Sequence, residues 1–507
     1  MITPVSSPAQ DSLAPAASHR HGGWFMSLWF RMAMGGVISL SVAMGLYTGA
    51  PTGFVVGELV LGLSVLVSLW LLAGRRLFNP IQAVVVVFYW WFGIGPTVIA
   101  LWDVLVGKPE AALAAQTLGL ESLWVVAPGL IIYACVAKIT LVSFSSTGRF
   151  AKFLLPRASN YRPKVILVYV LAMSFASVVL LALDRAGIHG EEETSFFGGT
   201  RTTIWWVGVI AAIGSISPFV SSALMKFCVQ PWKTIPGKVK VLLGVVIAQT
   251  VFGALFSGWK SPIVFLGAYF ACSYLSRHQK LPWLLLTIGA TVFLFIITPF
   301  VMTGRSSAID SGANSSELRK QVYSEVMKDP KGFLPIGLKA IDVSIFFRGI
   351  YPVAGEITRG TRLTRGQWSD DTILWGFETL VPRAINPNKR DQNIGNFFSR
   401  TVGAKIGMSN EGDTLNSLAT SIPFEFVGNY GVFAGILSFG LIGFFWTILC
   451  VWVLSPMRLS SHPLAPFFVL LVTGMESPVG AFLATIRGLI IPMLFCYLVY
   501  RWLHGKI

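Results

Sequence analysis

The chain has 507 residues, of which 54% are hydrophobic and only 12% are charged, and its formal net charge is +16. A water-soluble protein of this length does not bury so much apolar surface around its cores, so lipid must be the main solvent. Alternating, lightly charged strands of about ten residues are absent, which argues against an outer-membrane barrel. We therefore predict an all-α polytopic membrane protein.

Segments of about twenty apolar residues recur along the chain, and each is long enough to cross a hydrocarbon core of about 30 Å as a helix. About twelve spans are predicted, at 28–49, 52–73, 80–105, 121–144, 165–184, 204–226, 239–257, 260–276, 282–303, 426–454, 464–481 and 487–503. The predicted units are a disordered cytoplasmic tail without a removable signal peptide (1–27), a transmembrane bundle of about nine spans (28–303), a large loop domain (304–425) and a C-terminal bundle of about three spans (426–507).

Lys and Arg are concentrated on one side of this arrangement, where Asp11 is the single acidic residue. The basic residues there are Arg20, Arg31, Arg75, Arg76, Arg149, Lys152, Arg157, Arg162, Lys164, Lys226, Lys233, Lys238, Lys240, Arg277, Lys280, Arg458, Arg501 and Lys506. Because basic residues resist translocation, we place these segments and both termini in the cytoplasm, and the large loop on the opposite side. The net charge is therefore mostly a topology signal, and we exclude nucleic acid as a partner.

The large loop has the composition of a folded segment. Asn314-Ser315-Ser316-Glu317 has the spacing of a capping box before an amphipathic stretch, and Ser369-Asp370-Asp371 predicts the start of a helix that runs through Leu380. A third apolar stretch, from Ile336 to Ile350, is expected in the membrane interface or against the bundle. We predict a partly helical loop.

Basic residues are unusually dense in this loop for a segment outside the cytoplasm. Nine of them lie within about sixty residues: Arg348, Arg359, Arg362, Arg365, Arg383, Lys389, Arg390, Arg400 and Lys405. The planar fork of Arg and the compact charge of Lys suit phosphate, so the cluster fits a pyrophosphate-linked lipid at the membrane surface. The alternative is that these residues form ordinary surface ion pairs, because long translocated domains tolerate basic residues.

Lys260 lies at a tight external turn between two predicted spans, in the sequence Ser257-Gly258-Trp259-Lys260-Ser261-Pro262. Pro near the first helical position leaves backbone donors pointing outward at the positive end of the helix dipole, where a phosphate could dock. A Lys that only reaches toward lipid head groups remains the alternative.

The loop contains no His, so proton abstraction from a sugar hydroxyl on this side falls to a carboxylate or to no single residue. The candidates are Asp370, Asp371, Glu411, Asp413 and Glu425. Asp370 and Asp371 are also explained as residues that complement a helix dipole. Glu58 is predicted about a third of the way into its span, a depth at which charges usually face the bundle interior.

Two segments near the end of the loop carry a family resemblance. The first runs from Leu380 to Lys389 (LVPRAINPNK), and the second from Pro423 to Gly431 (PFEFVGNYG) opens a predicted span. Together with the small-residue turn at Gly258 to Ser261, they resemble Wzy-type polysaccharide repeat-unit polymerases, the O-antigen and exopolysaccharide polymerases, over roughly residues 250–450. Lys260 stands where many relatives have Arg. Lys cannot make the two parallel hydrogen bonds to a phosphate that an Arg guanidinium makes.

The resemblance implies a GT-C-like membrane fold and a glycosyltransferase in the bacterial inner membrane. Such an enzyme transfers a growing glycan from one undecaprenyl pyrophosphate carrier to the next lipid-linked repeat unit, without a metal or a nucleotide sugar. Its partners are the lipid-linked oligosaccharide, membrane lipid and a chain-length regulator protein. By the resemblance, Lys260, Arg383 and Glu425 are the catalytic residues, and Glu425 orients the loop or the acceptor.

The same basic cluster is expected to hold pyrophosphate through Lys260, Arg365, Arg383, Lys389 and Arg390. Glycan binding is expected from aromatic and amide side chains, namely Trp368, Trp375, Asn386 and Asn388. The alternatives are that Trp residues near a membrane anchor in head groups and that Asn-Pro pairs form turns.

Two other functions remain open. An O-antigen-type ligase shares the architecture and the donor, although ligases of this superfamily typically have an external His. A transporter or flippase of lipid-linked sugars should line its cavity with charges along many spans and needs no large external domain. Both features favour the polymerase.

Overall fold

The structure is a computed structural model that describes part of the chain. The described residues are 19–72, 79–105, 107–145, 163–185, 224, 232–257, 261–278, 282–292, 350–364, 371–381, 397–398, 400, 402, 420–454, 459, 465–486, 494, 498 and 502. All the secondary-structure elements in these residues are helical, as the sequence predicts.

The N-terminal half of the bundle has a helical run at each of its predicted spans, although α1 begins at His19 rather than at 28 and α5 at Pro109 rather than at 121. Its elements are α1 (His19–Tyr47), α2 (Thr52–Leu71), α3 (Pro80–Tyr89), the π-helical turn η1 (Trp90–Ile94), α4 (Gly95–Leu105) and α5 (Pro109–Ser145). Helix α3 begins where the Asn79 side chain accepts hydrogen bonds from the Ile81 and Gln82 amides, and Pro80 occupies the first turn. The predicted span 80–105 is therefore one continuous run of three helical elements.

Five described helices are long and apolar enough to cross a membrane: Phe30–Tyr47, Thr52–Leu71, Pro80–Leu105, Pro109–Phe144 and Val432–Leu454. Further helices coincide with other predicted spans, namely α7 (Pro163–Arg185), α10 (Gly237–Ser257), α11 (Ser261–His278) and the start of one in α12 (Trp283–Val292). The predicted spans 204–226 and 487–503 lie almost wholly outside the described residues, so the count of twelve remains a prediction.

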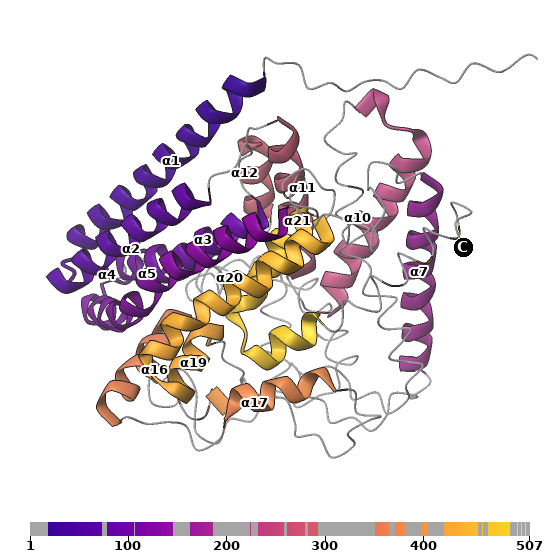
Figure 1. Cartoon of the computed structure of the whole chain (residues 1–507). Helices are drawn as coiled ribbons and strands as arrows, with labels where there is room; N and C mark the ends of the chain where they lie inside the picture. Colours follow the sequence, from indigo (N-terminus) through magenta and orange to yellow (C-terminus); the bar gives the residue numbers. More distant parts are fainter. Residues whose placement is uncertain are drawn as a thin grey trace, which may run out of the picture.

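Helices α5 and α20 (Val432–Leu454) form the centre of the bundle, and α2, α4 and α16 (Ile350–Thr364) also pack against α5 (Figure 1). Small residues allow the central pair to approach closely: a Cβ on Gly443 would lie 2.8 Å from the Tyr133 carbonyl oxygen. The Trp446 indole donates a 3.0 Å hydrogen bond to the Pro80 carbonyl. Aromatic packing of Phe88 on Phe439 extends this core.

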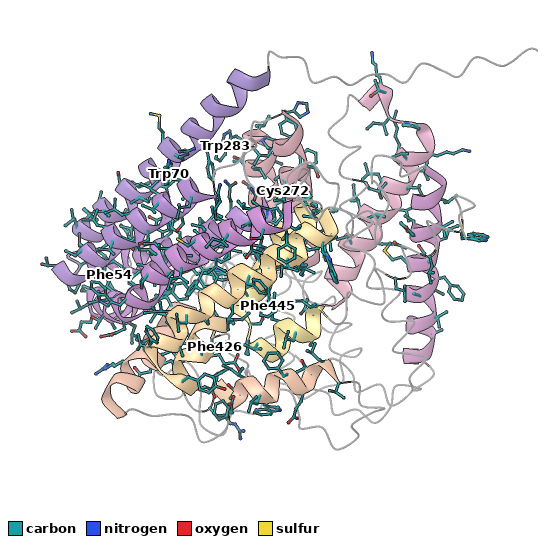
Figure 2. The ribbon with its side chains drawn as sticks, viewed as in Figure 1. Phe54, Trp70, Cys272, Trp283, Phe426 and Phe445 are labelled. Carbon is teal, nitrogen blue, oxygen red and sulfur yellow. The ribbon has the colours of Figure 1, made fainter. Side chains whose placement is uncertain are left out.

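Glu58 lies inside the bundle, as its predicted depth indicates. Its side chain is 1% exposed and its Oε1 accepts hydrogen bonds from the Ser41 hydroxyl at 2.7 Å and the Tyr89 hydroxyl at 3.4 Å. Ser41 also lies 3.3 Å from the Thr97 hydroxyl, so this polar cluster joins α1, α2, α3 and α4. Phe54, on the same helix α2 and labelled in Figure 2, is fully buried in the hydrophobic core.

The described parts of the predicted loop pack against the bundle. Helix α16 contacts α5 and α19 (Ile422–Tyr430), and Gly355 on α16 abuts the Leu118 carbonyl of α5. Helix α17 (Thr372–Phe377) continues into the 3₁₀ turn η5 (Glu378–Leu380), which confirms the predicted helix from its cap at Asp371 through Leu380; Ser369 and Asp370 lie outside the described residues. The elements α16, α17 and α19 lie at one end of the bundle (Figure 1).

The C-terminal part adds α21 (Ala465–Leu471), which continues into the 3₁₀ helix η8 (Val472–Glu476), and a helical stretch at 479–486. Helix α21 packs against α3 and α11. This segment places the Val479 backbone next to Glu425 of α19.

Candidate functional site

The second resemblance segment, Pro423 to Gly431, forms α19, a short helix set off from the α20 span. Gly431 separates the two helices with φ 92°, a conformation that favours glycine. Helix α19 ends at Tyr430 because Gly431 leaves the helical conformation. The span predicted at 426–454 therefore begins at Val432.

Ser421, the residue before α19, has φ 62° and ψ 149°, a region occupied almost entirely by glycine. Its amide donates a 2.7 Å hydrogen bond to the Glu476 carbonyl of η8. This bond joins the start of α19 to the C-terminal segment. Backbone strain of this kind concentrates at functional sites, so Ser421 draws attention to α19.

Glu425 is fully buried in the contact between α19 and the C-terminal segment. Its Oε2 accepts a 2.5 Å hydrogen bond from the Val479 amide, and its Oε1 has no hydrogen-bond partner of ordinary geometry in the described part of the chain. The Thr372 hydroxyl lies near the same carboxyl. We call the contact formed by Asp371, Thr372, Ser421, Glu425, Asn429, Tyr430 and Val479 the Glu425 junction.

Burial raises the pKa of Glu425 to about 7, because the low-dielectric surroundings disfavour the charged carboxylate. The Val479 amide and the Thr372 hydroxyl act in the opposite direction and lower the pKa, whereas the nearby charge of Asp371 raises it further. The carboxyl therefore titrates near neutral pH.

Asn429 makes three hydrogen bonds, and two of them join α17 to α19. Its Oδ1 accepts from the Thr372 amide at 3.1 Å, and its Nδ2 donates to the Thr372 hydroxyl and to the Glu425 carbonyl, both at 2.8 Å. The side chain is buried and the two segments are 57 residues apart in sequence. Asn429 thus fixes the position of the first turn of α17.

Asp371 caps α17 and also reaches the end of α19. Its Oδ1 accepts from the Ile373 and Leu374 amides, which confirms the predicted role at a helix start. Its Oδ2 accepts a hydrogen bond from the Tyr430 hydroxyl. Burial, the hydrogen bond to Asp371 and the negative charges of Asp371 and Glu425 raise the pKa of Tyr430 to about 12.

Replacing Asn429 with leucine should lower the free energy of unfolding by about 2 kcal/mol, because the buried Thr372 amide loses its acceptor and cannot reach water. Thermal unfolding in nanodiscs measures the change. Tyr430→Phe is the control, since it removes a hydrogen bond at an exposed ring and should cost less than about 1 kcal/mol. Equal losses in the two variants would contradict the fastening role of Asn429.

Of the predicted site residues, Glu425 and Trp375 belong to the described part of the chain, and both lie at or beside the Glu425 junction. Trp375 on α17 is half-buried, and its indole nitrogen is buried without a hydrogen-bond partner among the described residues. The others lie outside the described residues: Lys260, Arg365, Arg383, Lys389, Arg390, Trp368, Asn386 and Asn388. For Lys260 the flanking helices are in place, since α10 ends at Ser257 and α11 begins at Ser261.

The sequence did not predict the contacts of Asp371 with Tyr430 and of Thr372 with Asn429. The signal available was the Asn-Tyr-Gly turn inside the second resemblance segment, but nothing local to that turn indicates which distant residues it meets. Among the described residues, no three His, Cys, Asp or Glu side chains gather as ligands for a metal ion. The junction offers instead two carboxyls, an amide and three hydroxyls.

Comparisons of the chain with protein families, curated proteins and solved structures find no match. The class of the protein therefore rests on its own helices. The described architecture, all helical with five helices able to cross a bilayer, is that of an α-helical membrane protein.

Proposed function

We propose that the protein polymerises undecaprenyl-pyrophosphate-linked oligosaccharide repeat units into polysaccharide, at the periplasmic face of a bacterial inner membrane. The bond between the donor sugar C1 and the pyrophosphate oxygen breaks, and the electron pair leaves with the pyrophosphate. The acceptor hydroxyl of the next repeat unit forms the new glycosidic bond, and its proton passes to the surrounding water. A GT-C-like arrangement of about twelve spans belongs to this proposal.

The observation that supports the proposal is the hydrogen-bonded contact of α17, the helix that leads through η5 into the first resemblance segment, with α19, the second segment. The first begins at Leu380, the last residue of η5, and the second is α19. Asn429 ties the first turn of α17 to α19, so the helix that precedes the basic first segment is held against the second segment.

Glu425 acts in this proposal as a positioning residue. Its carboxyl has no exposed surface and holds the Val479 amide, so it orients α19 without touching substrate. Arg383, Lys389 and Arg390 follow η5 directly in sequence and supply the cations that a leaving pyrophosphate needs. Lys260, Arg365 and the aromatic and amide residues Trp368, Asn386 and Asn388 keep their predicted roles.

The test is the size distribution of lipid-linked glycan after purified repeat-unit carrier is added to the protein in liposomes. We expect a ladder of products from the parent and single units from Lys260→Ala and Arg383→Ala. The control is Lys108→Ala, because Lys108 is exposed at the start of α5 and lies outside the basic cluster.

Each failure has its own meaning. Carriers that change leaflet without lengthening would replace the polymerase with a flippase, and transfer of one glycan to a different acceptor would replace it with a ligase. A full ladder from both variants would remove Lys260 and Arg383 from the reaction.

A further inference from the structure

In α17 and η5 most of the large apolar side chains lie on the outward face, whereas a helix that faces water carries them on its inward face. The face toward the protein consists of Thr372, Ile373, Gly376 and Thr379, and Ile373 is the one large apolar residue among these four. The large apolar side chains face outward, namely Leu374 (63% exposed), Phe377 (50%), Leu380 (41%) and Val381 (37%). A helix in water normally buries the larger apolar set, so this segment is built for apolar surroundings.

The orientation of α17 is fixed by its contacts. Asp371 and Asn429 hold its first turn, and a Cβ added to Gly376 would lie 2.8 Å from the Gly480 amide nitrogen. Because backbone approaches that closely on the inner face, α17 cannot rotate to bury Leu374 and Phe377 without losing these contacts. The outward direction of its apolar face is therefore a property of the fold.

The exposed face of α17 continues an exposed apolar surface that leads into the membrane. Tyr430, bonded to Asp371, is 46% exposed, and Phe433, the second residue of α20, is 72% exposed. From there large exposed side chains recur along α20, a candidate span, at Leu437, Leu441 and Phe445. Phe445 is labelled in Figure 2. A stripe of this kind on a membrane-crossing helix faces lipid.

We propose that α17 and η5 lie in the bilayer interface, with Leu374, Phe377, Leu380 and Val381 at the boundary between lipid head groups and acyl chains. Tyr430 then stands at head-group level, where an aromatic side chain with a polar tip is favoured. Arg383, Lys389 and Arg390, which follow in sequence, complement anionic head groups. The occupant of this face is lipid, and the inference does not depend on the proposed reaction.

The test uses a spin label at Phe377→Cys, in a variant whose five cysteines are replaced by alanine, reconstituted in nanodiscs of phosphatidylethanolamine and phosphatidylglycerol. Collision of the label with oxygen, which concentrates in lipid, is compared with collision with a water-soluble nickel chelate. We expect a several-fold preference for oxygen, similar to that of a label at Phe445→Cys on the lipid-facing stripe. A label at Leu380→Cys repeats the measurement on the same face should Phe377→Cys fold poorly.

The matched control is a label at Lys108→Cys, which lies exposed at a helix start and should favour the nickel chelate. A label at Phe377 that behaves like the one at Lys108 would show that α17 faces water. Protection from both reagents would show that protein covers this face, from this chain or a second copy. Either result overturns the inference, and neither bears on whether the protein polymerises glycan.

Discussion

Replacing Glu425 with alanine should lower the free energy of unfolding by about 3 kcal/mol and abolish ladder formation. The substitution leaves the Val479 amide without its acceptor and opens a cavity in a fully buried contact. Helix α19 would then keep only the Ser421–Glu476 hydrogen bond as its described link to the C-terminal segment. Thermal unfolding in nanodiscs and glycan sizes from the liposome assay measure the two effects.

The same residue makes stability depend on pH with a definite sign. Burial raises the pKa of Glu425 to about 7 from its ordinary value of 4.5, so the folded protein holds a proton that the unfolded chain has released between these values. The contribution is fully present below about pH 4.5 and is lost as pH rises to about 7, by an amount on the order of 3 kcal/mol.

Glu425→Gln is the matched control for both effects. Glutamine keeps an oxygen that can accept from the Val479 amide, so α19 stays in place and ladders still form. Its side chain does not titrate, so the loss of stability between pH 4.5 and 7 should be smaller than in the parent by the Glu425 contribution. Identical pH profiles for the parent and Glu425→Gln would contradict titration of this carboxyl in that range.

Gly355→Ala should lower the free energy of unfolding by about 3 kcal/mol, on the scale of severe overpacking. The added Cβ would overlap the Leu118 carbonyl, and because this is backbone of the central helix α5 it cannot swing aside. Helix α16 must therefore move away from the bundle and expose Tyr351 and Val353, which are now buried. Thermal unfolding and faster proteolysis within α16 report the change.

Gly360→Ala lies on the same helix and provides the control. An added Cβ there meets no atom within 4 Å, so the change should be neutral or stabilising by up to about 1 kcal/mol through helix propensity. If both substitutions left stability unchanged, the close approach of α16 to α5 would be wrong.

Local sequence signals predicted the helices well. Runs of apolar residues predicted the five candidate spans, and Ser369-Asp370-Asp371 predicted the start of α17, because hydrophobic length and capping act within a few residues. The inward position of Glu58 followed from the cost of a charge in lipid.

Contacts between distant segments were beyond this reasoning. Thr372 meets Asn429 and Val479 meets Glu425 only because α17, α19 and the C-terminal segment pack at one end of the bundle, and no local pattern encodes such a choice. Glu425 was singled out through its motif, but its burial was not foreseen. The outward apolar face of α17 was missed as well, since Leu374 and Phe377 resemble ordinary core residues in sequence.

The hydrogen bond between Glu425 and Val479 also bears on biogenesis. Its two partners are 54 residues apart, and Val479 is synthesised second. At about 5–20 residues per second, the Glu425 carboxyl waits roughly 3–10 s for its donor while α20 and α21 are still being inserted. The carboxyl can remain hydrated in that interval, so α19 should settle against the bundle late, once the last helices have entered the membrane.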